Sequence, residues 1–468
     1  MWSFAKSKKN WHKLFFIRPI IGFQEIKQMK YIILLTGLMF LAIAGTAQEI
    51  LSLSDAVKKT IEKNPSIQIQ KFEMTRASNN LFKANVGAAP VVRAVAGGSY
   101  LSNYADVQLR TFQAEPEFIN VDEFGVETVN GELGIQADYV VYDGGRRDTR
   151  FKLLQGLSMV ERARQEVLIN QTILAVSDLY TEIAKLQKQA AFIQQSIENG
   201  KARLSKMRDR KQFGQANSLD ILRLQTALNQ DEATFDDIKL VKANLIRDLN
   251  FLMGDELDAR FSVEYDSDIP EIPELSVIQQ AIEAENPQLQ LSRVGIQVSE
   301  SELQLAELDM RPTLGAFARV GYNYQRNDVQ QLAEIQTAGV ALGFNASYTL
   351  FDGGVRKNRT ANSRIGLEKA YAEQQLTRTK LFNQALKEQS TYVLLRNQIE
   401  REQQNKVTFD EAFTKTQDLF LSGKVDNLAL RDAELARQNV QLRIDELQAD
   451  LTKSYWRLML LMGNAVVD

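Results

Sequence analysis

The sequence YVVYDGGRR at positions 139–147 returns as YTLFDGGVRK at positions 348–357, a distance of 209 residues between the two aspartates. Upstream, Asn64-Pro65 corresponds to Asn286-Pro287 at a distance of 222 residues. Two constant distances with a single 13-residue change between them indicate an internal duplication, in which each copy forms half of one architecture. Further pairs at the shorter distance are Gly214 with Gly423 and Leu252-Met253-Gly254 with Leu461-Met462-Gly463.

The repeated Asp-Gly-Gly marks a change of pattern in both copies. An alternating apolar segment precedes it, and a long proline-free helical pattern follows it. Aspartate can cap the first turn of a helix, and paired glycines permit the backbone angles of a sharp bend. One such tripeptide would indicate only a turn, whereas two in the same context predict strand-to-helix hinges. The hinge residues are Asp143, Gly144, Gly145, Asp352, Gly353 and Gly354.

The N-terminal region has the pattern of an export signal. Met29-Lys30 opens an apolar run that ends in the small residues Gly45-Thr46-Ala47. This pattern predicts a secretory signal peptide cleaved before Gln48, with 1–47 absent from the mature chain. A membrane anchor is the alternative, but the apolar run is shorter than the roughly 20 residues that a spanning helix needs. We expect Met29 to be the true start and 1–28 to be upstream sequence.

Composition excludes several kinds of site. The 468 residues contain no cysteine, so disulfides and thiolate-bound metals are excluded. The single histidine, His12, lies in the segment expected to be removed, which excludes histidine triads and histidine-bound metals from the mature chain. The net charge of −3, with both signs interspersed, argues against a nucleic-acid partner. We therefore expect no cofactor and no metal.

The duplication predicts the organisation of the mature chain. The first repeat would comprise 48–254 and the second 276–468, separated by an acidic linker with two prolines at 255–275. Alternation with period two predicts strands at about 91–106, 131–142, 313–325 and 338–351.

The alternation places apolar residues on one face of each strand. Tyrosines lie toward the strand ends, which is typical of strands in a membrane β-barrel. A half-buried hairpin of a soluble protein has the same alternation; the export signal and the absence of a long apolar helix favour the barrel. The apolar sets are Leu133, Ile135, Ala137, Tyr139, Val141; Leu314, Ala316, Ala318, Val320, Tyr322, Tyr324; and Val340, Leu342, Phe344, Ala346, Tyr348, Leu350.

Long helices are predicted elsewhere. Leu53 to about Ala88 is helical, interrupted at Asn64-Pro65, where proline can begin a helix. A helix from Arg146 to about Phe213 would be roughly 100 Å long, and its equivalent runs from Val355 to about Leu421. Each ends at a glycine-containing turn, after which a second helix returns, so that the helical regions span 146–254 and 355–463. Apolar residues at heptad spacing are Ile169, Ile173, Val176, Tyr180, Ile183, Leu186, Ala190, Ile193 and Ile197, and in the second copy Phe409, Phe413, Thr416 and Phe420.

Two strand hairpins are too few to close a barrel, and sheet edges cannot stay open in lipid. Strands of several chains must therefore complete one barrel. Three protomers give twelve strands and a usable lumen, whereas two give eight strands and an interior filled by side chains. The expected fold class is mainly α with a membrane β-barrel, in which the polar helices project into an aqueous compartment.

At this point the chain resembles the TolC-type outer membrane efflux protein family. The resemblance rests on the two strand–DGG–helix elements, the paired Asn-Pro helix starts and the turn FGQANSLDIL at 213–222, and it covers 49–468. It implies a homotrimer with a β-barrel in the outer membrane and an α-helical barrel across the periplasm. It also implies two partners, a periplasmic adaptor protein and an inner-membrane transporter, with the chain acting as a passive export conduit.

The resemblance also implies roles for the turns at the helix ends. It maps adaptor contact onto Phe213 and Gly214 in the first repeat. In the second repeat it maps adaptor contact onto Ser422 and Gly423. Some family members carry two carboxylates six and nine residues after the second tip glycine, which form rings that constrict a cation-selective entrance.

This sequence departs from that two-ring pattern. Here Asp432 matches the second carboxylate, but Ala429 stands at the first. A threefold ring of Asp432 would concentrate cations; the alternative is an ordinary surface carboxylate. Asp220 is six residues after Gly214 and is the corresponding candidate in the first repeat.

Two other classes of function remain open from the residues alone. A secreted or periplasmic structural coiled-coil protein would account for the heptads and the signal peptide but not for four amphipathic strands. An enzyme would have to use carboxylates for acid–base chemistry, and no pair stands out from the solvated faces.

Overall fold

The computed structural model describes residues 49–110, 118–214, 217–264, 269–328 and 333–463. The expected signal peptide and its cleavage site lie outside these residues. The chain divides into two units. Among the described residues, the first unit consists of Glu49–Leu51 and Arg260–Ser262, where strand β1 (Glu49–Leu51) pairs with strand β4 (Phe261–Val263). Val263, the last residue of β4, and the other elements belong to the second unit.

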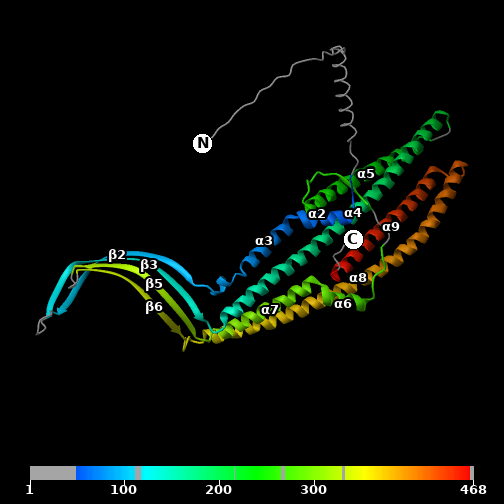
Figure 1. Cartoon of the computed structure of the whole chain (residues 1–468). Helices are drawn as coiled ribbons and strands as arrows, with labels where there is room; N and C mark the ends of the chain where they lie inside the picture. Colours follow the sequence, from blue (N-terminus) through cyan, green and yellow to red (C-terminus); the bar gives the residue numbers. More distant parts are fainter. Residues whose placement is uncertain (1–48, 111–117, 215–216, 265–268, 329–332, 464–468) are drawn as a thin grey trace, which may run out of the picture. The chain divides into compact units, whose positions relative to one another are not determined.

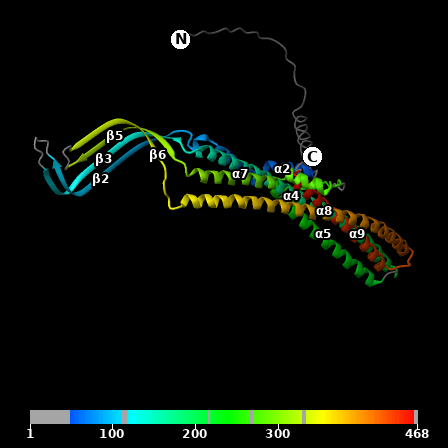
Figure 2. The same cartoon turned by 90° about the horizontal axis from the view of Figure 1, so that it is seen from below.

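A four-stranded antiparallel sheet is the β-structure of the second unit (Figure 1 and Figure 2). Its strands are β2 (Val91–Arg110), β3 (Phe118–Tyr142), β5 (Thr313–Asn327) and β6 (Glu334–Ser347), in that spatial order. Each repeat thus contributes one hairpin, and the pairing of β3 with β5 joins the two hairpins.

The strand bounds differ from those predicted at both ends of the sheet. Strands β2 and β3 continue to the pair Arg110–Phe118, because backbone pairing persists where the apolar alternation has faded. Strand β6 ends at Ser347 rather than near position 351. Ser347 pairs with Thr313, and the residue before Thr313 is a proline, which has no N–H to extend the ladder.

The register places the alternating apolar residues of all strands on one face of the sheet. One row across the sheet is Ala94, Ile135, Val320 and Val340. Side chains of this face are largely exposed in the single chain; that of Val340 is 71% exposed. The opposite face carries ion pairs, including Arg319 with Glu132 at 2.8 Å. The sheet therefore has one apolar and one polar face, as the sequence predicts.

The helices follow the duplication. The first repeat contains α2 (Leu53–Lys63), α3 (Pro65–Asn79), the 3-10 helix η1 (Lys83–Val86), α4 (Arg146–Gln212) and α5 (Ser218–Met253). The second contains α6 (Leu275–Glu285), α7 (Pro287–Leu308), α8 (Val355–Leu421) and α9 (Asn427–Leu461). Helices α4 and α5 form one antiparallel hairpin and α8 and α9 another (Figure 1). Within the described residues, every helix is too short or too polar to span a lipid bilayer.

The helix predicted to reach about Ala88 ends earlier. Helix α3 stops at Asn79, and the 3-10 helix η1 carries the chain to Gly87. Gly87 has a φ of 81°, a left-handed conformation that glycine adopts without a steric penalty. The turn at Gly87 then leads into strand β2.

The Asn-Pro and Leu-Met-Gly landmarks of the two repeats contact each other. The Asn286 side chain accepts hydrogen bonds from the N–H groups of Gln288 and Leu289, and its Nδ2 donates to the carbonyl oxygen of Leu461 at 2.9 Å. In the first repeat, Asn64 Nδ2 donates to Leu252 O at 2.8 Å. Each asparagine thus caps one helix and binds the last turn of another, which explains why the two motifs recur together.

Asn286→Ala is expected to destabilise the protein by about 1–3 kcal/mol, because it removes a buried cap and leaves the Leu461 carbonyl without its donor. The measurement is the urea midpoint of the detergent-purified protein. Asn217→Ala is the control, since Asn217 is an exposed cap whose side chain accepts one hydrogen bond, from Leu219 N–H at 3.0 Å. Equal midpoint losses in the two variants would contradict a role beyond capping.

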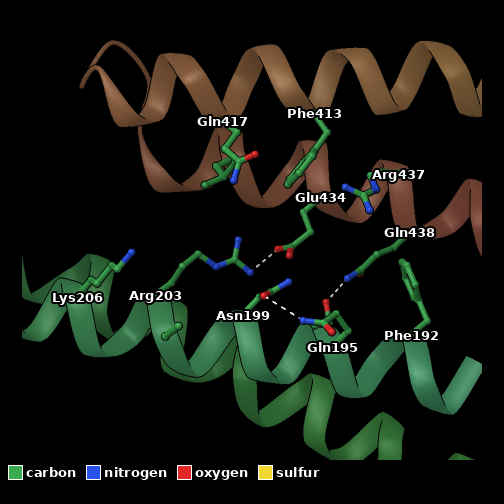
Figure 3. A pocket seen from close by; sticks show the side chains of 13 residues that line it. Phe192, Gln195, Asn199, Arg203, Lys206, Phe413, Gln417, Glu434, Arg437 and Gln438 are labelled. Atoms are coloured by element: carbon green, nitrogen blue, oxygen red, sulfur yellow. Dashed lines mark hydrogen bonds and ion pairs between the residues drawn. The ribbon is translucent and has the colours of Figure 1, made fainter.

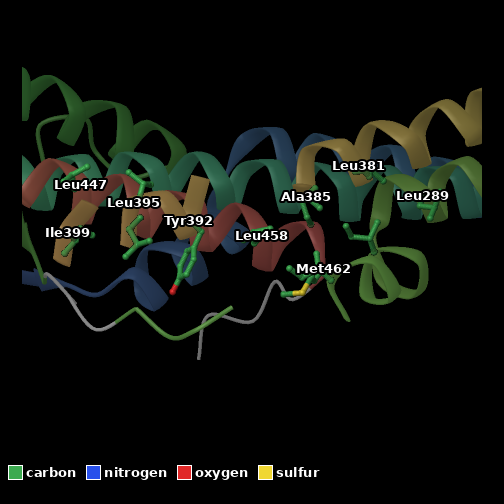
Figure 4. Packing of buried hydrophobic residues seen from close by; sticks show 13 residues of the cluster. Leu289, Leu381, Ala385, Tyr392, Leu395, Ile399, Leu447, Leu458 and Met462 are labelled. Atoms are coloured by element: carbon green, nitrogen blue, oxygen red, sulfur yellow. The ribbon is translucent and has the colours of Figure 1, made fainter. Parts of the chain in front are cut away.

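A hydrophobic core of the second repeat lies between α6, α7, α8 and α9 (Figure 4). Tyr392 is 2% exposed, and its hydroxyl donates to the carbonyl oxygen of Pro270 at 2.7 Å, which ties the linker to α8. The members of the core are Ile278, Ile282, Leu289, Leu381, Ala385, Tyr392, Leu395, Ile399, Leu447, Leu451, Leu458, Leu461 and Met462.

The two predicted heptad seams have different outcomes. In α4, the seam from Ile173 to Ile197 is buried, and only Ile169 is half-buried. In α8, Phe409 is exposed and Phe413 and Phe420 are half-buried, so this seam is not a buried core in the single chain. Helix α8 packs against α6, α7 and α9, and these neighbours do not cover its whole surface.

Candidate functional site at the hairpin tips

The first hairpin tip joins α4 to α5. Helix α4 ends at Gln212, and Gly214 adopts a left-handed φ of 72°. Phe213, between them, is 78% exposed. Asn217 caps α5 through its side chain. The tip thus presents an aromatic ring to its surroundings rather than packing it inside the hairpin.

The second hairpin tip repeats this geometry with different side chains. Gly423 has a φ of 72°, and its N–H donates to Phe420 O at 3.0 Å. Ser422 replaces the aromatic residue, and its hydroxyl donates back to the last turn of α8. Asp426 caps α9 by accepting the N–H of Ala429 at 2.9 Å.

The candidate constriction carboxylates lie just after the tips. Asp220 is half-buried in the first turn of α5, and Asp432 is exposed near the start of α9. The side chain of neither residue forms an ion pair with any other residue that the structure describes. Asp432 is therefore available to solvent ions in the single chain.

A polar network connects the two hairpins a few turns from the tips, and Figure 3 shows its pair Arg203–Glu434. Arg203 of α4 pairs with Glu434 of α9 at 2.5 Å, and Arg431 of α9 pairs with Asp231 of α5 at 2.6 Å. Arg431 also binds Glu434 at 3.2 Å. We call these four residues the inter-hairpin network. It joins both helices of the first repeat to one helix of the second.

The inter-hairpin network is largely buried, and its charges act on the pKa of Arg431. Burial opposes the charge of Arg431, but its hydrogen bond to Asp231 and the two nearby carboxylates raise its pKa above the usual range. Removing one partner of such a pair would leave the other charge without compensation, at a cost of about 3–5 kcal/mol. The network therefore favours the arrangement in which the hairpins stay together.

Sequence patterns do not reveal the inter-hairpin network. Arg203 and Glu434 are 231 residues apart in the chain, and each looks like one charge on a solvated helical face. Only the position of Glu434 within α9 indicates that its carboxylate is buried. Glu434 lies four residues after the buried Leu430 and four before the buried Gln438, which places a carboxylate within a buried stripe of α9.

The two hinges have similar backbones but different contacts. In the second, Asp352 accepts the N–H of Arg356 in the first turn of α8 at 2.9 Å, as a helix cap. In the first, the Asp143 carboxylate accepts the N–H of Gly145 at 3.1 Å, and the Asp143 carbonyl oxygen accepts the Arg146 Nε–H at 2.8 Å. Gly144 lies against Arg311 so closely that a Cβ atom would stand 2.5 Å from the Arg311 Cβ. Only glycine fits there.

Solved structures of bacterial membrane proteins share this architecture. A membrane protein from Pseudomonas aeruginosa superposes with a TM-score of 0.72 at 14% identity, covering 89% of this chain and 91% of that chain. The Campylobacter jejuni CmeC outer membrane channel superposes with a TM-score of 0.71 at 13% identity, covering 88% of this chain and 85% of that chain. The open state of the Neisseria gonorrhoeae MtrE outer membrane channel gives 0.68 at 13% identity, covering 88% of each. At these identities the likeness establishes the fold.

The sequence model for outer membrane efflux proteins matches residues 277–464, which is nearly all of the second repeat. The second repeat of the chain thus matches the outer membrane efflux protein family. No curated protein sequence matches the chain.

A buried carboxylate on α9 is expected to make the stability of the protein depend on pH. Asp445 of α9 is 4% exposed, and burial raises its pKa above the ordinary value of 3.8, although Gln441, Lys188 of α4 and Lys406 of α8 act in the opposite direction. Because the folded state binds this proton more tightly, the stability contributed by Asp445 falls as pH rises above that ordinary value.

Asp445→Asn is therefore expected to raise the urea midpoint at pH 7, since asparagine can still accept the hydrogen bond of Gln441 without a charge. The gain should vanish below pH 3.8, where the aspartate is protonated in both states. A midpoint difference that is independent of pH would contradict this assignment. Asp236→Asn, at an exposed position of α5, serves as the control.

Proposed function

We propose that this outer membrane efflux protein is the exit duct of a tripartite efflux or type I secretion system. It lies in the outer membrane and extends into the periplasm. In this proposal the chain catalyses no reaction: an inner-membrane transporter supplies the energy, a periplasmic adaptor connects the two, and the duct conducts passively.

The single observation that carries the proposal is the two-faced sheet. Its apolar face suits lipid, and its polar face, with the pair Arg319–Glu132, suits a water-filled lumen. In the described part of the chain, β2 and β6 each have one neighbouring strand. Three copies would join β2 to β6 of the next copy and close a twelve-stranded barrel, which removes every edge from lipid.

The exposed apolar residues of α8 support the homotrimer. Val393, Leu394 and Val407 are between 50% and 61% exposed in the single chain. Such a surface on a long helix marks an interface. We propose that neighbouring protomers cover it and so form the periplasmic helical barrel. A secreted coiled-coil protein would explain this helix surface but not the sheet.

In this duct, Asp432 and Asp220 are the proposed constriction residues, and Phe213, Gly214, Ser422 and Gly423 are the proposed adaptor contacts.

Asp432→Lys is expected to weaken cation preference, because three lysines would replace three carboxylates at the entrance. The measurement is the reversal potential of single channels in a planar bilayer under a salt gradient. Asp236→Lys, on the exposed surface of α5, is the matched control. Unchanged selectivity in Asp432→Lys would remove Asp432 from the pore lining.

A further inference from the structure

The two hairpin tips carry opposite charge at equivalent positions of the duplication. Residues 201–223 contain seven basic and two acidic side chains, whereas the equivalent residues 410–432 contain three basic and five acidic side chains. Individual positions show the same contrast: Arg223 corresponds to Asp432, and Lys201 to Asp410. Because the helices and turns are the same in both copies, the fold does not require this difference.

Part of the positive charge of the first tip has no ion-pair partner among the described residues. The side chains of Arg210, Lys211 and Arg223 are exposed and form no ion pair with other residues in the described ranges. Lys201, by contrast, pairs with Glu232 at 2.9 Å and so helps to hold α4 to α5. Three cations at the end of the hairpin thus remain available to a ligand.

Exposed apolar side chains lie among these cations. Phe213 is 78% exposed, Leu222 63% and Leu219 48%. Beside them, a groove of ≈ 560 Å³ runs between α4 and α5. Apolar anchors surrounded by uncompensated charge are a feature of binding surfaces.

We propose that the first-hairpin tip, defined as Phe213, Leu219 and Leu222 with Arg210, Lys211 and Arg223, binds an acidic amphipathic helix of its periplasmic partner. The apolar face of that helix packs on the phenylalanine and the leucines, and its flanking carboxylates pair with the three cations. This inference rests on the proposed function, in which the tips meet an adaptor, and it adds the chemistry of the adaptor surface.

An anionic membrane surface is the competing ligand, and the second tip argues against it. A lipid surface is broad, so it would also meet residues 410–432, whose acidic excess repels it. A single helix is narrow enough to contact the first tip alone.

The test uses two synthetic helical hairpins with the same apolar seam, one with glutamate and one with lysine at the flanking positions. Binding to the full-length, detergent-purified protein is measured at low and high salt. We expect the glutamate hairpin to bind more tightly than the lysine hairpin. Its affinity should fall about tenfold in high salt, because the charges are exposed.

The variant Arg210→Glu/Lys211→Glu should reduce that affinity about tenfold or more. The matched control Lys415→Glu/Lys424→Glu makes the same charge change on the second hairpin and should have little effect. Equal binding of the two probes, equal effects of the two variants, or binding only to phosphatidylglycerol vesicles would each overturn the proposal. Bilayer conductance of the same preparations separates the two claims: a wild-type protein that binds the acidic probe without conducting would refute the duct and leave the inference intact.

Discussion

Replacing Arg431 with methionine is expected to loosen the contact between the two helical hairpins and to increase single-channel conductance. Methionine keeps the aliphatic bulk but leaves the carboxylates of Asp231 and Glu434 without the guanidinium that binds both. Breaking a buried pair in this way costs about 3–5 kcal/mol. The cost falls on the state in which the hairpins are in contact, so the variant should populate separated hairpins.

Two measurements check this expectation. Conductance in a planar bilayer should rise, and limited proteolysis should cut near the second tip faster than in the wild type. Arg443→Met is the control, because Arg443 forms its ion pair with Glu446 on the solvated surface of α9, where such pairs contribute little. If Arg431→Met conducts like the wild type and like Arg443→Met, the inter-hairpin network does not restrain the tips.

Val340→Arg is expected to abolish most assembly in the outer membrane. Val340 lies on the apolar face of β6, and an arginine on the lipid face of a barrel costs about 2–4 kcal/mol at the bilayer midplane. Three copies in a trimer would multiply this cost. Thr337→Arg is the matched control: Thr337 is on the same strand but on the opposite, polar face, paired with Asn323. The measurement is the amount of heat-modifiable trimer in the outer membrane fraction.

The test depends on the difference in assembly between Val340→Arg and Thr337→Arg. A protein in which both arginines are tolerated would not place the apolar face of the sheet in lipid. A protein in which both abolish assembly would have neither face in water.

Much of the fold is predictable because the same order of strands, hinge and long helices occurs in both repeats. The hinges at Asp143 and Asp352 are visible because period two gives way to a heptad period at the same point in each repeat. The buried seam of α4 follows from its spacing. The exposure of Phe409 in α8 does not, because spacing shows which residues share a face but not whether a neighbour in the same chain covers it.

Contacts between residues that are far apart in the chain could not be predicted from the sequence. The hydrogen bond from Asn286 to Leu461 explains why the Asn-Pro and Leu-Met-Gly motifs recur together. Neither motif alone indicates that it contacts the other. The inter-hairpin network depends on three helices meeting, and each of its charges is ordinary in isolation. Strands β2 and β3 are longer than predicted because hydrogen bonding between backbones does not require apolar alternation.

The most direct test of the duct is single-particle imaging of the mature protein extracted in detergent from the outer membrane fraction. We expect threefold particles with a detergent belt at one end, where the twelve strands close, and a helical barrel projecting beyond it. Thin, soluble rods without a belt, independent of detergent, would contradict this expectation and would favour a structural coiled-coil protein instead.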